Sequence, residues 1–538
     1  MVTMDRREFL KSVGIGTLLL STGGVSSLVS AHGMNGSLGF DQLDPRNPSN
    51  FTNPLLLPSN SGMIGIFEPS VNFTTTTKEI SYELIPGKIT KLWVYEVEQK
   101  GELYTNPIIK IRKGDSFNTT LKNALSEKTI IHWHGLKVDW KNDAHPFYAI
   151  DPEGTYQYDF SVINRSAAYW YHAHPHPSTG KQIYFGLSSF FIVEDEEEIN
   201  LTNSLDLNFG ETDIPLIIKD GQFDGDGNLV YNPSMMDLFM GFLGDMTFVN
   251  YTLNPYIDVS QRIYRFRTLN SSNARIYRLA FLKGSEQIPF HIIGNDGGLL
   301  DQPYQVTEVF LSPGERVDVV LDLRNAQEGD TIFLKSLSFD PMENEMGGMG
   351  NGMGGRSSSS LSNGEEFYIL KLNVKNKTSY DRQLPKSLSE ITPINMGQEN
   401  TRQFTLSTSM MQWFINGWRF DMNEYPVVVD KGSIEIWEIN NSFMSMPHPM
   451  HIHGFPFQVL ERNGSPDQVR RLAIDSKGLL PTDKGWKDTV LIWPGEKVKL
   501  AIDFSHGFPD EQVFLFHCHN LEHADQGMMI NYKVIQKF

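Results

Sequence analysis

The chain is 538 residues long, with 40% hydrophobic, 12% aromatic and 20% charged residues. This composition is typical of a folded protein and excludes a mainly disordered chain. The formal net charge of −18 argues against a nucleic-acid partner, because a strongly acidic chain offers no basic face to neutralise phosphates. The length is too great for one hydrophobic core and predicts about three to four domains.

The first 31 residues have the features of an export signal. Arg6-Arg7 is followed by residues 9–11 (Phe-Leu-Lys), a mildly apolar stretch from Val13 to Val29, and a small-residue cleavage site at residues 29–31. The twin arginines resemble a Tat signal, which exports folded proteins to the periplasm or the medium. An uncleaved membrane anchor is the alternative, but glycines interrupt the stretch and it is short for spanning. No later segment has 18 consecutive apolar residues, so we expect no membrane span in the mature chain.

After the signal, the chain is rich in short segments of alternating polarity and lacks long amphipathic helical patterns. Trp93, Tyr95 and Val97 form one such segment, and residues 317–321 form another. Turn residues bound these segments at short intervals. The pattern predicts an all-β protein made of sandwiches or barrels.

A turn motif recurs along the chain. A glycine followed by a polar residue and an alternating segment occurs at Gly114, Gly314, Gly432 and Gly495. Glycine suits such a turn because it adopts positive φ without a steric penalty. The recurrence suggests several copies of one β-domain, although unrelated β proteins also contain this motif.

Residues 342–360 break the strand pattern, because they are almost wholly Gly, Met, Ser and Asn. Met342, Met346, Met349 and Met353 are spaced along this segment. Such a composition cannot bury a core, so we expect a mobile loop. Thioether sulfur prefers Cu(I) to hard ions, so the loop is a candidate substrate site, and a tolerated flexible insertion is the alternative.

Ten of the 15 histidines lie in four short clusters, which contain four His-x-His pairs: His132/His134, His172/His174, His451/His453 and His517/His519. On a strand, residues two apart project from the same face. Four pairs can therefore supply eight imidazoles to one cavity. A single pair is usually an ordinary surface feature, whereas four pairs favour a cluster of metal ions, copper above all.

The chain has one cysteine, Cys518, which lies between two of these histidines. Its side chain must project from the opposite face of the strand, where it can meet His448, His523 and Met528. Two histidines, a thiolate and a weak axial methionine form a blue-copper electron-transfer site. Met529 is adjacent, but the ten-residue spacing from the cysteine favours Met528. A buried, inert thiol is the alternative.

In this order, the motifs resemble those of the bacterial multicopper oxidases: His-Trp-His-Gly, a second His-x-His, His-Pro-x-His-x-His and His-Cys-His-x3-His-x4-Met. The similarity covers nearly the whole mature chain, including residues 264–267 and 294–298. It implies three cupredoxin-like Greek-key domains at residues 32–200, 201–380 and 381–538. It also implies an enzyme, expected to be a monomer, that oxidises a donor at a type 1 copper and reduces O2 to water at a trinuclear copper cluster.

The resemblance assigns ligands to four copper ions position by position. His132 and His451 would hold the type 2 copper. The type 3 pair would be held by His134, His172 and His519 on one ion and by His174, His453 and His517 on the other. The type 1 copper would take His448, Cys518, His523 and Met528. The remaining histidines are expected not to be ligands: His32, His145, His176, His291 and His506. Of these, His176 is expected to lie nearest the ligands.

Reducing O2 consumes protons, which a carboxylate near the cluster should relay. In similar oxidases an aspartate lies nine residues after the second histidine of His-Trp-His, which is Asp143 in this chain. A solvated turn residue is the alternative. Relatives carry a glutamate at the position of Ala524, and we expect the side chain of the following Asp525 to point elsewhere.

Residues 339–343 (Phe-Asp-Pro-Met-Glu) resemble the start of the methionine-rich insert of bacterial copper-efflux oxidases, which oxidise Cu(I). This similarity makes Met342, Glu343, Met444 and Met446 tentative substrate residues. Asn344, Phe339 and Met444 depart from the residues found at the family's substrate positions.

Three functional hypotheses follow from these residues. The first is a Cu(I) oxidase active in copper tolerance. The second is a laccase-like oxidase of phenols and aromatic amines, and one enzyme could have both activities. The third is a copper-free structural or binding relative, which would have lost ligands, whereas every expected ligand type is present here.

Overall fold

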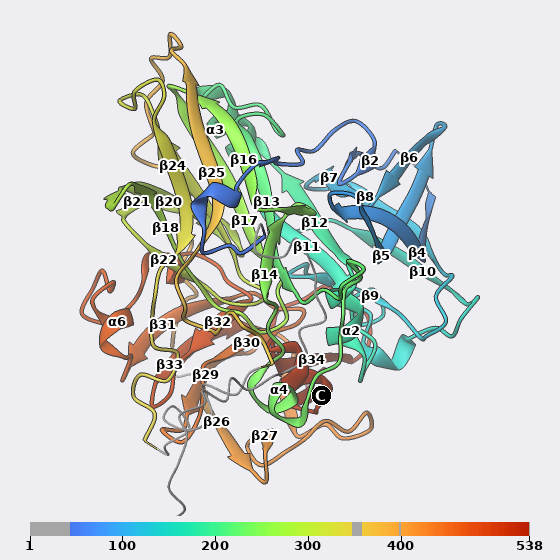
Figure 1. The fold of residues 1–538 in the computed structure, drawn as a ribbon. Helices are drawn as coiled ribbons and strands as arrows, with labels where there is room; N and C mark the ends of the chain where they lie inside the picture. Colours follow the sequence, from blue (N-terminus) through green and yellow to red (C-terminus); the bar gives the residue numbers. More distant parts are fainter. Residues whose placement is uncertain (1–42, 71, 347–357, 398–399, 537–538) are drawn as a thin grey trace, which may run out of the picture. The chain divides into compact units, whose positions relative to one another are not determined.

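The computed structural model describes residues 43–346, 358–397 and 400–536, apart from residue 71 (Figure 1). The predicted export signal, His32 and residues 347–357 of the methionine-rich loop lie outside the described residues. Strands dominate, and the longest helix in the described part of the chain, α3 (Glu196–Ser204), has 9 residues. The prediction of an all-β protein is confirmed.

The first two sheets enclose a core between them, with strands drawn in blue to cyan in Figure 1. One sheet has the order β10 (Thr155–Ser161), β8 (Ser116–Asn123), β4 (Phe73–Ile85), β5 (Lys88–Gln99), β6 (Glu102–Thr105) and β2 (Gly62–Met63). The other has the order β3 (Ile66–Phe67), β7 (Ile108–Arg112), β12 (Ser188–Glu194), β11 (Ala167–Ala173) and β9 (Ile131–His134). Inward-facing aromatic side chains, among them Phe117 and Trp133, fill the space between the sheets. We call these two sheets the first sandwich.

The middle sandwich consists of two larger sheets with their own core. One contains β1 (Asn53–Pro54), β16 (Pro255–Ser260), β25 (Phe367–Asn376), β24 (Thr331–Ser336), β18 (Tyr277–Lys283) and β19 (Glu286–Ile288), with β22 (Val309–Leu311) paired to β18. The other contains β15 (Thr252–Leu253), β14 (Met246–Val249), β13 (Asp213–Gly221), β17 (Ile263–Asn270), β23 (Arg316–Asp322), β20 (Phe290–Asn295) and β21 (Gly298–Val306). The predicted alternating segment at residues 317–321 lies in β23, and Val317, Val319 and Leu321 are all buried in this core.

The last sandwich, orange to red in Figure 1, repeats the arrangement. One sheet has the order β27 (Gln412–Ile415), β26 (Asn400–Ser409), β29 (Ile434–Asn441), β33 (Lys497–Asp503) and β31 (Phe457–Asn463). The other has the order β28 (Val427–Asp430), β35 (Met529–Ile535), β34 (Gln512–Cys518), β30 (His448–Ile452) and β32 (Thr489–Ile492). Besides α3, the described α-helices are short: α2 (Thr179–Tyr184), α4 (Met235–Met240), α6 (Asp467–Arg470) and α7 (Leu521–Asp525).

The recurrent turn glycines adopt the backbone conformation expected of them. Gly114, Gly314, Gly432 and Gly495 have φ of 97°, 86°, 79° and 73°. Side chains other than glycine rarely adopt such values, so the turn motif reflects a backbone requirement. In the described part of the chain, no helix is both long and apolar enough to span a membrane.

Candidate metal centres

Strand register brings the histidine pairs together. In the antiparallel pairing of β9 with β11, His132 lies opposite His172. In the pairing of β30 with β34, His451 lies opposite His517. The second histidine of each pair lies two residues from the first, so it projects on the same side. Each of the two sandwiches therefore presents four imidazoles on one face.

Imidazole rings of the first and last sandwiches stack on one another. His132 stacks on His453 with ring centroids 3.8 Å apart, and His134 stacks on His451 at 3.7 Å. Ring nitrogens within 4.8 Å of one another form three buried triads: His132/His134/His451, His134/His172/His519 and His174/His453/His517. The structure thus gathers all eight histidines of the four pairs into one cluster between these two sandwiches.

Hydrogen-bond acceptors indicate which nitrogen of each ring carries the proton. Nδ1 of His453 lies 2.8 Å from Asp143 Oδ2, and Nδ1 of His451 lies 2.8 Å from the carbonyl oxygen of Asp488. An acceptor at Nδ1 holds the proton there and leaves a lone pair on Nε2. The same applies to three further rings, whose Nδ1 faces a carbonyl oxygen: His132, His172 and His517. In His134 the two nitrogens exchange these roles, because its Nε2 lies 3.0 Å from Asp488 Oδ1 and its Nδ1 faces Nε2 of His172 at 3.3 Å.

The free nitrogens face one another. Nε2 of His453 lies 3.1 Å from Nε2 of His517, and burial lowers the pKa of His517 to about 4. Among the described residues, both ring nitrogens of His519 and Nδ1 of His174 are buried without a hydrogen-bond partner. Neutral imidazoles with converging, unpartnered lone pairs fit bound metal ions, and imidazole nitrogen suits copper.

A second site lies in the core of the last sandwich. Sγ of Cys518 lies 3.5 Å from Nδ1 of His448 and 3.6 Å from Nδ1 of His523. Nε2 of His523 donates to the Phe239 carbonyl oxygen at 2.9 Å, and Nε2 of His448 lies 3.1 Å from Ser445 Oγ. Both rings therefore direct Nδ1 at the sulfur. Burial raises the pKa of the Cys518 thiol, so a thiolate at this position requires a bound cation.

Aromatic side chains cover this second site. The Trp413 ring lies 4.6 Å from the His448 ring and 5.3 Å from the His523 ring. Phe239 of α4 stacks on Trp413 at 4.8 Å, and its carbonyl oxygen accepts the Trp413 indole N–H. A segment of the middle part of the chain thereby covers a site whose candidate ligands all belong to the last sandwich.

Met528, the expected axial ligand, is buried in the same core cluster as Cys518. Its backbone carbonyl accepts the N–H of Cys518 at 3.0 Å, and its N–H donates to the His523 carbonyl at 2.8 Å. Met529 instead lies opposite His517 in the pairing of β34 with β35. The backbone therefore places Met528 next to both neighbouring ligands.

Two buried aspartates connect the first and last sandwiches in opposite directions. Asp143 of the first reaches His453 of the last, with Oδ2 2.8 Å from Nδ1, and its Oδ1 lies 3.4 Å from His132 Nδ1. Asp488 of the last reaches His134 of the first at 3.0 Å. Asp143 was expected near the cluster. Asp488 was missed, because Lys-Asp-Thr has no feature in the sequence that distinguishes it from an ordinary strand boundary.

Asp525 is directed at another part of the chain. Its carboxylate accepts the backbone N–H of Thr179 at 3.0 Å and that of Gly180 at 2.7 Å, at the start of α2. Burial raises its pKa to about 8. The side chain is thus occupied by α2, and Ala524 beside it carries no ionisable group.

Four of the predicted non-ligands lie in the described residues: His145, His176, His291 and His506. None of the four belongs to a triad of metal-binding groups formed by the described residues. The His176 ring packs edge-on against Phe420 at 4.8 Å.

The tentative substrate residues differ in exposure. Met342 and Met446 are buried in the same core cluster as Cys518, whereas Met444 is 60% exposed. The carboxylate of Glu343 accepts two backbone N–H groups at the start of α6. It is therefore already used to hold the local fold.

Helix α4 adds methionines that sequence reasoning missed. Met236 and Met240 pack, partly buried, against the core cluster that contains Cys518, and Met235 is 73% exposed. In the sequence, residues 235–240 are only a short apolar run. Their proximity to the second site is a product of tertiary contact.

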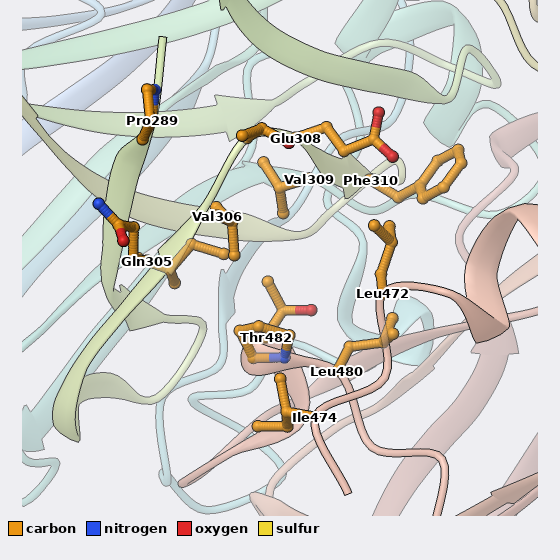
Figure 2. Close-up of a pocket in the computed structure, with 13 residues that line it drawn as sticks. Pro289, Gln305, Val306, Glu308, Val309, Phe310, Leu472, Ile474, Leu480 and Thr482 are labelled. Atoms are coloured by element: carbon orange, nitrogen blue, oxygen red, sulfur yellow. The ribbon is translucent and has the colours of Figure 1, made fainter. Parts of the chain in front are cut away.

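Two cavities lie outside the metal-binding triads. The cavity in Figure 2, of about 370 Å³, has apolar walls that include Phe310, Leu472 and Leu480, and none of the predicted ligands lines it. A second cavity of about 640 Å³ is lined by residues that include Gly135 and Asp488. Only this second cavity borders a residue that contacts the histidine cluster.

Comparison with known proteins agrees with these sites. Family models described as multicopper oxidase match residues 87–198 and 391–537. Multicopper oxidase mco of Staphylococcus haemolyticus is 33% identical over 432 residues, which cover 80% of this chain and 81% of that protein. The laccase of Bacillus subtilis is 28% identical, with 89% of this chain and 97% of that protein covered.

A solved structure extends the comparison to three dimensions. The McoA multicopper oxidase of the hyperthermophile Aquifex aeolicus superposes with a TM-score of 0.79 at 42% sequence identity. The match covers 90% of this chain and 99% of that chain. The similarity therefore includes all three sandwiches.

Proposed function

The chain belongs to the multicopper oxidase family, which binds four copper ions, and on that premise we propose that the histidine cluster and the Cys518 site hold those ions. The protein is an oxidoreductase with a cupredoxin-type fold. Copper bound at these sites would supply one-electron transfer from a donor to O2, which would be reduced to water.

The proposed ligand sets follow the free nitrogens. His132 and His451 hold the type 2 ion through Nε2. The two type 3 ions are held by His134, His172 and His519 and by His174, His453 and His517. His448, Cys518, His523 and Met528 hold the type 1 ion. The two type 3 sets and the group His448, Cys518 and His523 are each supported by ligand atoms that lie within 4.8 Å of one another. The type 2 pair is supported by the 3.4 Å distance between Nε2 of His132 and Nε2 of His451.

The chain connects the two kinds of site covalently. Cys518 lies between His517 and His519, so a single peptide bond on each side connects the residue of the type 1 thiolate to a proposed ligand of each type 3 ion. Strand alternation makes this possible, because neighbouring side chains project from opposite faces. The thiolate contacts the core of the last sandwich, while the flanking imidazoles contact the cluster.

Asp143 is the proposed proton relay. Its carboxylate is fully buried and, among the described residues, forms ion pairs only with His132 and His453. No Lys or Arg side chain of the described residues forms an ion pair with it. Asp488 differs, because Arg316 binds its carboxylate at 2.6 Å. Of the two aspartates, Asp143 is therefore the one we propose as the general acid and base.

We propose Cu(I) as the electron donor, in a role in copper tolerance. The observation that carries this proposal is the number of thioether groups in and against the core that contains Cys518. Met342 and Met446 lie in that core cluster, and Met236 and Met240 pack against it. Exposed Met444 lies four residues before His448. Thioether sulfur favours Cu(I) over hard cations.

A laccase-like activity on phenols and aromatic amines is the second candidate. Phe443, next to Met444, is 48% exposed and provides an aromatic surface near His448 on which a ring could pack. The similarity to a laccase agrees with this alternative.

Steady-state oxidation of Cu(I) and of 2,6-dimethoxyphenol by the copper-loaded protein separates the two candidates. Met444→Leu removes a sulfur at nearly constant volume, and we expect kcat/KM for Cu(I) to fall about tenfold, equivalent to about 1.4 kcal/mol, with the phenol rate unchanged. Met410→Leu is the control, because Met410 is 95% exposed on the β26–β27 turn. A wild-type protein that oxidises the phenol but not Cu(I) would establish the laccase alternative.

Three further proposals concern the chain as a whole. We propose export by the Tat route, supported by the twin-arginine segment, and a monomeric enzyme. We also propose domain boundaries near residues 200 and 380, which lie between the last strand of one sandwich and the first long strand of the next. The short strand β1 is an exception, since it pairs with β16 of the middle sandwich although it precedes the first.

A further inference from the structure

The middle sandwich supplies none of the proposed ligands, yet one of its turns touches the histidine cluster. This turn, residues 312–315, joins β22 to β23. A Cβ built on Gly314 would lie 2.8 Å from Cδ2 and 2.9 Å from Cγ of His519. Gly314 also has φ of 86°. The backbone of the turn therefore lies directly against one face of the His519 ring, at a distance that only glycine permits.

Arg316, two residues later, is fully buried and uses all five of its N–H donors. Two bind the carboxylate of Asp488, at 2.9 Å to Oδ1 and 2.6 Å to Oδ2. The other three donate to backbone carbonyl oxygens of Ala168, Gly314 and Asp296. A planar guanidinium whose donors are all hydrogen-bonded is held in one orientation, so it binds the Asp488 carboxylate in a fixed bidentate geometry.

Asp488, whose carboxylate is oriented by Arg316, in turn contacts the His134 ring. Its Oδ1 lies 3.0 Å from His134 Nε2, while the bidentate pair with Arg316 fixes the plane of the carboxylate. Asp488 and Gly135 both line the cavity of about 640 Å³, and Asp488 Oδ2 is 2.4 Å from where a Cβ on Gly135 would lie. The cavity gives the carboxylate room to rotate away from the imidazole, and the ion pair with Arg316 opposes that movement.

We propose that the segment from Gly314 to Arg316 is a positioning element of the middle sandwich for one of the two type 3 copper ions. Gly314 sets the plane of the His519 ring. Arg316, acting through Asp488, holds the proton on Nε2 of His134 and leaves Nδ1 for the metal. Both histidines belong to the same triad, whereas the triad of the other type 3 ion is backed by Asp143 of the first sandwich. This inference rests on the ligand sets proposed above.

The first test compares two glycines with similar backbone strain. Gly314→Ala places a methyl group against His519, whereas Gly114 has φ of 97° and no atom within 4 Å of its Cβ position. In copper-loaded protein, we expect Gly314→Ala to lose most of the near-ultraviolet type 3 absorption and to bind fewer than the four copper ions of the family, with the blue type 1 band retained. Gly114→Ala should keep both bands and the full copper content.

The second test compares two buried arginines. Arg316→Gln should weaken copper retention against a chelator by about 10- to 100-fold, and Arg316→Lys should restore part of it by keeping the charge. Arg462 is also buried and ion-paired, to Asp483 and Glu496, away from the cluster. Arg462→Gln should lower the melting temperature but leave copper retention per folded molecule unchanged.

The outcomes separate this inference from the ligand proposal. If the wild-type protein lacks the type 3 band at full copper loading, the proposed ligand sets are wrong. The inference is wrong if the wild type has the type 3 band and two further results hold. Gly314→Ala would keep the same type 3 absorption as Gly114→Ala, and Arg316→Gln would retain copper as well as Arg462→Gln does. The middle sandwich would then only pack against the other two. If one of these variants is too unstable to purify, Arg316→Lys is measured instead. Copper retention below that of the wild type supports the inference, and retention equal to the wild type contradicts it.

Discussion

The first and last sandwiches present the same pair of histidine strands to each other, yet among the described residues only the last contains a second candidate metal site, at His448, Cys518 and His523. In β11, Ala173 lies between His172 and His174, and in the last sandwich Cys518 lies between His517 and His519. Both middle residues are fully buried in the core of their own sandwich. The comparison separates two functions of one strand motif. The outer histidines of both sandwiches form one shared cluster, and under the proposed assignment the middle residue decides whether the sandwich also holds a type 1 ion.

Each of these two sandwiches also contributes one aspartate that contacts a histidine of the other sandwich. The partners of the two aspartates differ, and the difference indicates a different role for each. Asp143 contacts His453 and, among the described residues, forms no ion pair with an arginine, whereas Asp488 contacts His134 and is bound by Arg316. A carboxylate bound by a buried guanidinium is held in one orientation and can orient its own partner. A carboxylate that faces only imidazoles lacks this constraint. The comparison therefore supports the two proposed roles, proton relay for Asp143 and positioning of His134 for Asp488.

The largest effect on donor oxidation is expected from a substitution that makes the residue between the two histidines the same in the first and last sandwiches. Cys518→Ala gives the last sandwich the residue that the first has at Ala173. The intense blue colour should disappear and donor oxidation should fall to background, because no thiolate remains to bind the type 1 ion. The histidine cluster should keep its copper, measured by metal analysis and the near-ultraviolet band. A variant that stayed blue would refute the type 1 assignment, and Cys518→Ser should behave like the alanine variant.

A smaller effect is expected from Asp143→Asn, which keeps the size of the side chain but removes its ability to relay a proton. Turnover should fall by about 10²- to 10⁴-fold with the copper content unchanged, as measured by oxygen consumption. Asp139→Asn is the control, since Asp139 lies in the same turn and bonds only to local groups. If oxygen consumption fell equally in both variants, the relay role of Asp143 would be wrong.

The smallest effect on donor oxidation is expected from a substitution at the edge of the proposed type 1 site. Ser445 Oγ lies 3.1 Å from His448 Nε2 and is buried. Ser445→Ala should remove a hydrogen bond worth about 1 kcal/mol and change the donor oxidation rate by only a few-fold. The position of the blue absorption band reports the change directly. Ser442→Ala, which removes a contact to the Met444 backbone instead, should leave the band in place.

Short-range periodicity explains why so much of the site could be predicted. A strand repeats every two residues, so His-x-His specifies two imidazoles on one face, and His-Cys-His specifies a thiol on the other. The turn glycines at Gly114 and Gly314 were likewise predictable, because positive φ is a property of the residue itself. These features depend only on local backbone geometry, and the structure agrees with each of them.

Tertiary structure alone decided which distant groups meet these local motifs. Asp488 and Arg316 lie 172 residues apart, and Arg316 belongs to the sandwich without ligands. Phe239 of α4 likewise contacts His523 across 284 residues. Neither contact follows from a repeat or a spacing, because sandwich packing is set by the shapes of whole surfaces. The sequence by itself determined which histidines share a strand face and that Cys518 projects from the opposite face. Packing of the three sandwiches determined which distant side chains, such as Asp488, Arg316 and Phe239, contact these proposed ligands, because packing depends on the shapes of whole surfaces.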